Sequence, residues 1–177
     1  MGRKILLGVV GNNGSGKSTF CNYLASKNFL VVSLSDVIRD SLKAKSLEPN
    51  RENLTEHANE LKKKYGLTYC AQKTYDLVTK SNTKFAVFDS IRHPAEVKYL
   101  QEKKVKLVAI KTSIENRYNR IKQRKRQTDF INYETFRNHD DKLTLNATDL
   151  GEPPPQNTSS PCTANSMARN ALCAMGP

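Results

Sequence analysis

The sequence lacks any apolar run close to the roughly 20 residues that a helix needs to span a bilayer. Its start, MGRKILLGVVG, has a short apolar stretch and no small-residue cleavage site, so it does not have the pattern of a secretory signal peptide. At 177 residues the chain is long enough for one domain with a sizeable core and short for two. We therefore predict one cytoplasmic domain without a membrane partner.

Motifs that bind zinc are also missing. No HxE or PCxxC segment occurs, which excludes the zinc site of nucleobase deaminases. The cysteines are far apart and form no CxxC pair, so we expect free thiols, as in a reducing cytosol. They are Cys21, Cys70, Cys162 and Cys173.

Acidic residues are outnumbered: 17 Asp and Glu stand against 29 Lys and Arg, giving a formal net charge of +12. Much of the excess lies in residues 98–126, where eleven Lys and Arg accompany only Glu102 and Glu115. A surface of this sign attracts polyanions. Nucleic acid and a compact polyphosphate both fit this charge.

Short apolar runs alternate with segments of helical period. The runs predict strands at 4–10, 29–33, 84–89 and 105–110. The helical period predicts helices at 18–26, 36–45, 52–64, 68–81, 95–103, 113–126 and 132–142. Such alternation is typical of a three-layer α/β fold around a parallel sheet.

The composition changes after about Leu145, where Pro, Ser, Asn and Thr become frequent and no apolar period remains. We predict a working domain over residues 1–145, with the fifth strand of its sheet missing or altered. Residues 146–177 are expected to be a disordered or aberrant tail, produced by truncation or a frame shift.

Residues 11–19, GNNGSGKST, follow an apolar strand and precede a helix, which is the context of a phosphate-binding P-loop. Glycines let backbone N–H groups approach phosphate oxygens, and the helix N-terminus adds its positive end. Lys17 would reach the β- and γ-phosphates, and Ser18 would bind Mg²⁺. The predicted nucleotide-binding residues are Gly11, Asn12, Asn13, Gly14, Ser15, Gly16, Lys17, Ser18 and Thr19.

Charged residues also follow the other strands, at the edge where open α/β sheets bind ligands. Asp89 ends the third strand and is predicted to anchor Mg²⁺, with Arg92 in the same space. After the second strand, Ser35 and Asp36 stand where a helix begins, and Arg39 follows one turn later. Asp36 is therefore either a helix cap or part of the binding site.

The basic helix over 113–126 carries Arg117, Arg120 and Arg124 at spacings of three and four, which predicts one shared face. Transfer of a phosphoryl group requires fixed cations around the moving charge. A solvated basic face and an RNA-binding helix remain the alternatives.

These motifs resemble those of P-loop nucleoside monophosphate kinases, the group that includes adenylate kinase and dephospho-CoA kinase. The segments that carry this resemblance are SLSDVIR (33–39), FDSIR (88–92) and ENRYNRIKQRKRQTD (115–129). The resemblance implies that Arg39 and Arg92 hold the acceptor, and that Arg120 packs on the donor base. It also implies that Arg124 meets the phosphates and that Asp89 supports Mg²⁺.

A closer resemblance is to adenylate-kinase-like domains with SDVIR, RENL, DSIR–P-EV and RYxRxxxRxR motifs, which occur alone or ahead of deoxycytidylate-deaminase-like domains. The third motif includes Pro94, Glu96 and Val97. The chain departs from adenylate kinase at His93, where that enzyme has an arginine, and its lid segment is short. His57 and His139 are isolated in the sequence, so we expect them at the surface rather than as ligands.

The leading hypothesis is an ATP- and Mg²⁺-dependent phosphotransferase with a small phosphorylated acceptor. Lys17, Arg92, Arg117 and Arg124 are its predicted catalytic residues, and Ser35, Asp36, Arg39 and Arg92 its predicted acceptor-binding residues. A regulatory nucleotide-binding module without turnover is the alternative. A nucleic-acid-binding NTPase is the third, suggested by the net charge.

Overall fold

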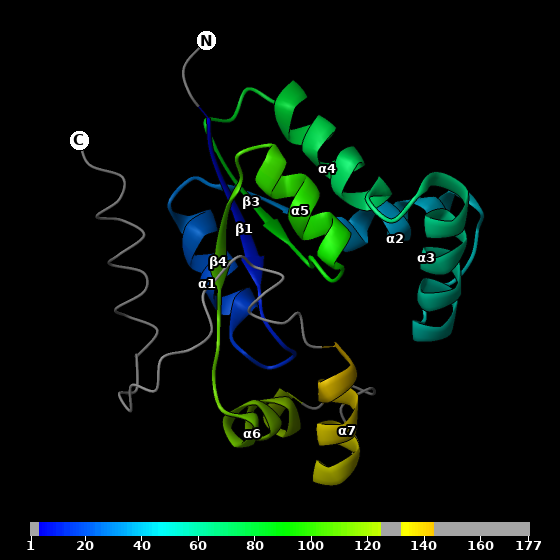
Figure 1. The fold of residues 1–177 in the computed structure, drawn as a ribbon, viewed down its shortest axis with the longest axis vertical. Coiled ribbons are helices and arrows are strands. Elements are labelled where there is room, and N and C mark those ends of the chain that lie inside the picture. The colour runs from blue at the N-terminus through cyan, green and yellow to red at the C-terminus, as the bar shows by residue number, and fades with distance from the viewer. Residues whose placement is uncertain (1–3, 125–131, 144–177) are drawn as a thin grey trace.

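The structure is a computed structural model that describes residues 4–124 and 132–143 (Figure 1). Every predicted helix and strand is present there, with ends within two residues of the predicted ones, although the predicted end of the 113–126 helix lies outside the described residues. The strands are β1 (Ile5–Val10), β2 (Leu30–Ser33), β3 (Phe85–Asp89) and β4 (Lys106–Ala109). The helices are α1 (Lys17–Ser26), α2 (Leu34–Ala44), α3 (Arg51–Tyr65), α4 (Tyr69–Lys80), α5 (Pro94–Glu102), α6 (Ile114–Arg124) and α7 (Tyr133–Leu143).

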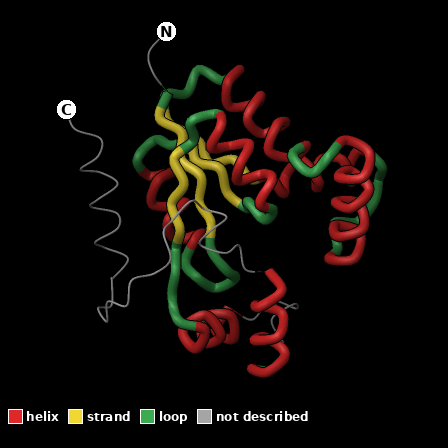
Figure 2. Tube along the Cα trace, viewed as in Figure 1, coloured by secondary structure: helices red, strands yellow, loops and turns green. Residues whose placement is uncertain are grey.

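The four strands form one parallel sheet in the order β2-β3-β1-β4 (Figure 2). The carboxyl ends of all four therefore meet at one edge. The P-loop leaves β1 at this edge, between the segments that follow β3 and β4. The predicted α/β fold with a parallel sheet is confirmed.

Side chains alternate across the sheet, so both faces are buried. Val9 and Val87 point to one face and pack with Leu24 of α1. Val10 and Phe88, their neighbours in the chain, belong to the cluster on the other face. Figure 1 shows α4 and α5 on that face, opposite α1. The result is the predicted three-layer arrangement.

Local signals set the helix ends. The Asn50 side chain accepts a hydrogen bond from the Asn53 N–H and caps α3, and Gly66, with φ 94°, ends that helix. Pro94 occupies the first turn of α5, where its missing N–H costs nothing. Two helical units stand away from the sheet: α3 packs against α2, and α6 packs with α7 beyond the carboxyl end of β4 (Figure 1).

Within the described residues the sheet has four strands. The expected tail at 146–177, the segment where a fifth strand was sought, and Cys162 and Cys173 all lie outside the described residues. Cys21 and Cys70 are buried free thiols, as expected. No helix in the described part of the chain has the length and apolar character needed to cross a bilayer.

Candidate nucleotide-binding site

The P-loop connects β1 to α1 through backbone conformations that favour glycine. Gly14 has φ 79°, and Gly16, the N-cap of α1, has φ 107°. A Cβ on Gly14 would lie 2.7 Å from the carbonyl oxygen of Arg117. Glycine is thus required at position 14 for two reasons, the positive φ and the close approach of α6. The helix N-terminus that results is an anion site by its geometry.

Lys17 lies in the first turn of α1, and its side chain folds along the loop. Its Nζ donates hydrogen bonds to the carbonyl oxygens of Gly11, at 2.6 Å, and Asn12, at 2.9 Å. Burial lowers the pKa of Lys17, the charge of Asp89 opposes this shift, and the charges of Arg92 and Arg117 add to it. Four predicted site residues from three parts of the chain therefore act on one another at this edge.

Asp89 ends β3 beside the loop, and its carboxylate is only partly satisfied. Oδ2 accepts a 3.5 Å hydrogen bond from the Ser90 hydroxyl, whereas the buried Oδ1 has no hydrogen-bond partner among the described residues. The hydroxyl of Ser15, buried in the P-loop, is likewise without a partner within the described ranges. Buried polar atoms are nearly always paired in folded proteins. These two oxygens therefore indicate a site where a ligand would supply the partner.

The environment of Asp89 includes two residues without a sequence signal. Ser90 has φ 64° and its hydroxyl accepts a hydrogen bond from Ser33 at the end of β2. Cys21 lies beneath the loop on α1. Burial, with the charge of Asp89, raises the pKa of this thiol to about 11. Ser18, the other predicted ligand of Mg²⁺, is exposed in the first turn of α1. Thr19, which was predicted to support that turn, is exposed beside it.

Two neighbouring residues after Asp89, Arg92 and His93, have different roles. The side chain of Arg92 is exposed, and its charge reaches Lys17. The ring of His93 accepts a hydrogen bond from the Ala95 N–H at 3.1 Å and caps α5. The buried carboxylate of Glu96 accepts from the N–H groups of Arg92 and His93, at 2.9 and 3.1 Å. Glu96, which belongs to the DSIR–P-EV motif but had no predicted role, thus fixes the backbone that presents Arg92.

On the β2 side, α2 begins at Leu34 and its N-cap is Ser33. The interpretation of Asp36 as a helix cap is therefore wrong, because this residue lies inside the first turn. Its Oδ1 instead accepts a 2.6 Å hydrogen bond from Arg39 Nη1, and both side chains are exposed. Ser35 is half-buried beside them. An exposed pair of this kind is weakly held, so Arg39 is free to exchange its partner for a phosphate.

The three arginines of α6 lie in different environments. Arg117 is buried, donates from Nε to the Thr112 carbonyl at 3.3 Å, and lies 5.7 Å from the ring of Phe136 on α7. Arg120 is exposed, and its Nη1 donates to the carbonyl oxygens of Gly14 and Ser15, at 3.3 and 3.1 Å. Helix α6 is thereby fastened to the P-loop.

Arg124 is exposed at the end of α6. Phe136, buried at 4% exposure, completes the environment of Arg117 and was not found from the sequence. The only sequence signal for it is an apolar residue in a short polar helix.

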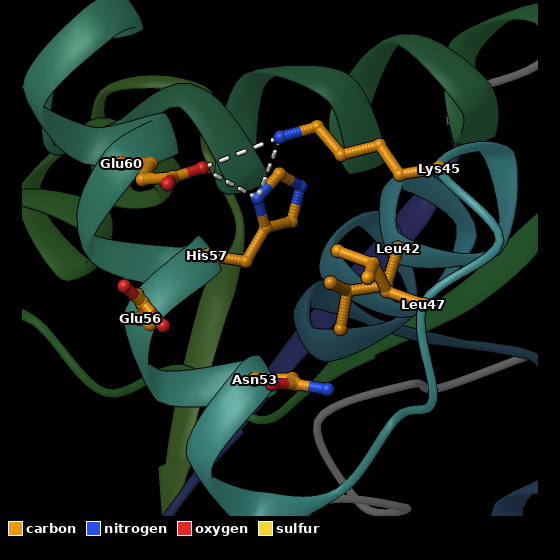
Figure 3. A pocket seen from close by; sticks show the side chains of 7 residues that line it. All are labelled: Leu42, Lys45, Leu47, Asn53, Glu56, His57 and Glu60. Carbon is orange, nitrogen blue, oxygen red and sulfur yellow. Dashed lines mark hydrogen bonds and ion pairs between the residues drawn. The ribbon is translucent and has the colours of Figure 1, made fainter.

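The expectation that His57 lies at the surface is wrong: 4% of it is exposed. Its ring lies between α2 and α3, with Nε2 2.8 Å from the Ser41 hydroxyl and Nδ1 3.0 Å from Glu60 Oε2. Lys45 Nζ lies 3.3 Å from the same carboxylate oxygen. His57, Glu60 and Lys45 border a recess of about 70 Å³ (Figure 3). The side chain of His139 lies outside the described part of the structure.

Known proteins resemble this chain in sequence and in fold. The family described as an AAA domain, AAA_18, matches residues 7–143. A UPF0200 protein of Methanoregula boonei is 36% identical over 126 residues, covering 70% of this chain and 69% of that protein. A UPF0200 protein of Methanococcus vannielii is 32% identical over 142 residues, covering 77% and 76%. The match to AAA_18 spans the P-loop, β3 and both helices of the α6–α7 unit.

One solved structure supports the fold alone. The crystal structure of TT1252 from Thermus thermophilus superposes with a TM-score of 0.62 at 17% sequence identity, covering 98% of this chain and 97% of that chain.

Proposed function

Because this chain belongs, with the UPF0200 proteins, to the AAA_18 family and has a P-loop kinase-like fold, we propose that it is an ATP-dependent phosphotransferase. The acceptor is a nucleoside monophosphate or a similar small phosphorylated metabolite, and the place of action is the cytoplasm. The observation that carries the proposal is the meeting of Lys17, Asp89, Arg92 and Arg117 at one sheet edge, where the last three shift the pKa of the first.

The donor half of the site fits a magnesium–triphosphate complex. Successive N–H groups of a glycine-rich loop can cradle phosphate oxygens. Lys17 already donates two hydrogen bonds within the loop, which phosphate oxygens can replace. The unpartnered Asp89 Oδ1 and the exposed Ser18 hydroxyl are oxygen ligands of the kind that Mg²⁺ prefers. Bound there, the ion would neutralise charge on the phosphates and orient them.

The acceptor half lies across the same edge, on α2 and the segment after β3. Arg39 and Arg92 are exposed and flank this side. Their planar guanidinium groups suit an acceptor phosphate, which they would hold in line with the donor. An acceptor phosphate oxygen forms the new bond to the γ-phosphorus, the bond to the bridging oxygen breaks, and that oxygen leaves on ADP. No side chain forms a covalent bond in this step.

The α6 arginines supply fixed positive charge. Arg117 is held between the Thr112 carbonyl and Phe136, so its charge is preorganised near Lys17. Arg120 lies on the loop, where it can cover the donor base. Arg124, exposed at the end of α6, would meet the phosphates. Fixing these charges before the substrate binds lowers the cost of neutralising the transferred group.

The test is a transfer assay with γ-labelled ATP, Mg²⁺ and a panel of nucleoside monophosphates plus dephospho-CoA. The proposal expects label in one acceptor and its loss in a Lys17→Ala variant. A Lys27→Ala variant, altered at an exposed lysine just past α1, is the matched control and should retain activity. Tight ATP binding without transfer to any member of the panel would reject the kinase for these acceptors.

The second candidate is a regulatory nucleotide-binding module without turnover, related to the front domain of deoxycytidylate-deaminase-like proteins. One observation favours it: His93, at the position of an adenylate kinase arginine, is engaged in capping α5. This candidate expects MgATP to raise the melting temperature while neither transfer nor hydrolysis occurs.

A further inference from the structure

The junction between α3 and α4 carries a group of aromatic and basic side chains away from the P-loop. We call it the α3–α4 corner. It consists of the exposed Lys63, Lys64, Tyr65, Leu67 and Lys73, together with Tyr69, which is half-buried against the core. Figure 1 shows this junction beside α2, remote from α6 and α7. The proposed phosphotransfer uses none of these residues, so the surface needs its own explanation.

Two tyrosine rings form a flat platform at this corner. Tyr65 and Tyr69 stack with their ring centroids 4.6 Å apart and an interplanar angle of 19°. Tyr65 is 48% exposed, and the neighbouring Leu67 is 46% exposed. Gly66, with φ 94°, makes the sharp turn that brings the end of α3 against the start of α4. The Tyr65 ring is therefore about half exposed, and it stacks on Tyr69 while the Lys64 ammonium lies over it.

The charge around the platform has a single sign. Residues 61–75 contain four lysines and no acidic residue. Lys64 Nζ lies 5.1 Å from the centre of the Tyr65 ring, and Lys73 Nζ lies 5.8 Å from that of Tyr69. The ammonium groups thus lie over the rings within the range of cation–π attraction, where a planar group of a ligand can replace them.

Helix stability accounts for only part of this pattern. The lysines in the last turn of α3 interact favourably with the negative end of the helix dipole. Lys73 lies in the second turn of α4, near the positive end, where a cation gains nothing from the dipole. A half-exposed tyrosine and leucine likewise lose free energy in water. Both features are explained by an anionic partner with planar groups.

We propose that the α3–α4 corner binds single-stranded nucleic acid. A base takes the place of the Lys64 ammonium over the Tyr65 ring, Leu67 contacts the base or its sugar, and the released Lys64 and the other lysines pair with neighbouring phosphates. Stacking of bases on aromatic side chains beside a basic surface is the general mode of sequence-tolerant single-strand binding. The net charge of +12 adds long-range attraction to such a strand.

The test measures binding of a fluorescein-labelled oligouridylate of about twelve nucleotides, within the usual range for one single-strand site. Fluorescence anisotropy is recorded with the full chain over a series of salt concentrations. Excess MgADP is present throughout, so that the strand cannot occupy the P-loop. We expect the logarithm of the affinity to fall linearly with the logarithm of the salt concentration.

Variants then locate the binding surface. Tyr65→Ala should weaken binding by roughly tenfold, the scale of one base–aromatic stack, and Tyr65→Phe should restore it. The double substitution Lys63→Gln with Lys64→Gln should reduce the salt slope by about 0.7 for each phosphate that these lysines neutralise. The control is Tyr23→Ala, because Tyr23 is 39% exposed with Lys27 Nζ 5.7 Å from its ring and so repeats the pair on α1. It should leave binding unchanged.

Several results would overturn the proposal. They are absence of binding at low salt, equal losses in Tyr65→Ala and Tyr23→Ala, or binding that survives both corner variants. Binding of vesicles containing phosphatidylserine through Tyr65, without binding of the oligonucleotide, would assign the corner to an anionic membrane instead. Thermal melting of each variant establishes that it is folded, and if Tyr65→Ala fails to fold, the lysine pair decides the outcome.

Discussion

Buried polar atoms are unpaired on one side of the binding edge and hydrogen-bonded on the other. At the P-loop, two buried oxygens, Ser15 Oγ and Asp89 Oδ1, have no hydrogen-bond partner within the described residues. Between α2 and α3, the buried His57 has both ring nitrogens within hydrogen-bond distance of neighbours, Ser41 and Glu60. One region holds unsatisfied polar atoms and the other a satisfied network.

This difference separates a binding site from a structural joint. Leaving a buried polar atom unpaired costs about 1–3 kcal/mol, so such atoms persist where a ligand completes them. A satisfied network contributes to stability and gains nothing from a ligand. We therefore propose that the P-loop side binds a ligand and that the His57 network holds α3 on α2, which also carries Arg39.

The largest expected effect is on the P-loop side. Lys17→Met removes the cation that would face the transferred phosphoryl group, and we expect the transfer rate to fall by about 10²–10³-fold. Single-turnover rates with γ-labelled ATP measure this change. Lys27→Met should leave the rate unaltered, and a fall of less than about tenfold in Lys17→Met would place the essential charge elsewhere.

Asp89→Asn keeps the shape of the side chain and removes its charge. We expect activity at a fixed Mg²⁺ concentration to fall by roughly 10–100-fold, the usual cost of losing a residue that orients a metal. Because Asp89 raises the pKa of Cys21, that pKa should also fall below its value of about 11. Alkylation of the thiol as a function of pH reports this shift. An unchanged Mg²⁺ dependence would remove Asp89 from the metal site, and Asp76→Asn, on the exposed face of α4, is the control.

His57→Leu tests the structural joint. The substitution leaves Ser41 and Glu60 without the imidazole, so we expect the free energy of unfolding to fall by about 1–3 kcal/mol. Urea denaturation measures it. The Kd for MgATP should not change, because the network lies on the other side of the edge. A weakened Kd with unaltered stability would reverse the two assignments.

The smallest effect concerns pH. The hydrogen bond from His57, followed by that from Lys45, lowers the pKa of Glu60 below its ordinary 4.5. A carboxylate with a lowered folded pKa stabilises the fold above its unfolded pKa and loses this contribution as the pH falls through the folded value. Glu60→Gln should therefore lower the melting temperature at pH 7, and the difference from wild type should shrink below pH 4.5. A difference independent of pH would contradict this linkage.

Local patterns were enough to predict the fold, and they placed several of the predicted site residues at one edge of the sheet. Apolar runs and helical periods located all the elements, because each follows from which side chains lie on one face. The P-loop side was predictable because carboxyl ends of parallel strands share an edge, which brings Asp89 to Lys17 without any knowledge of packing.

Contacts between helices could not be predicted in the same way. His57 is polar and sits in a polar helix, and its burial arises only when α3 docks on α2. The same holds for Arg117, because its buried environment includes the ring of Phe136 from a different helix. The cap of α2 was misplaced by three residues because Ser33, Ser35 and Asp36 are all good cap residues.

The central claim, that this edge transfers a phosphoryl group rather than only binding or hydrolysing a nucleotide, is tested most directly by stoichiometry. ³¹P NMR of a reaction with ATP, Mg²⁺ and the acceptor identified in the transfer assay quantifies ADP, phosphorylated acceptor and inorganic phosphate in one sample. The account predicts one phosphorylated acceptor for each ADP, with both absent in Lys17→Met. ADP matched by inorganic phosphate, or no ADP despite bound nucleotide, would contradict it.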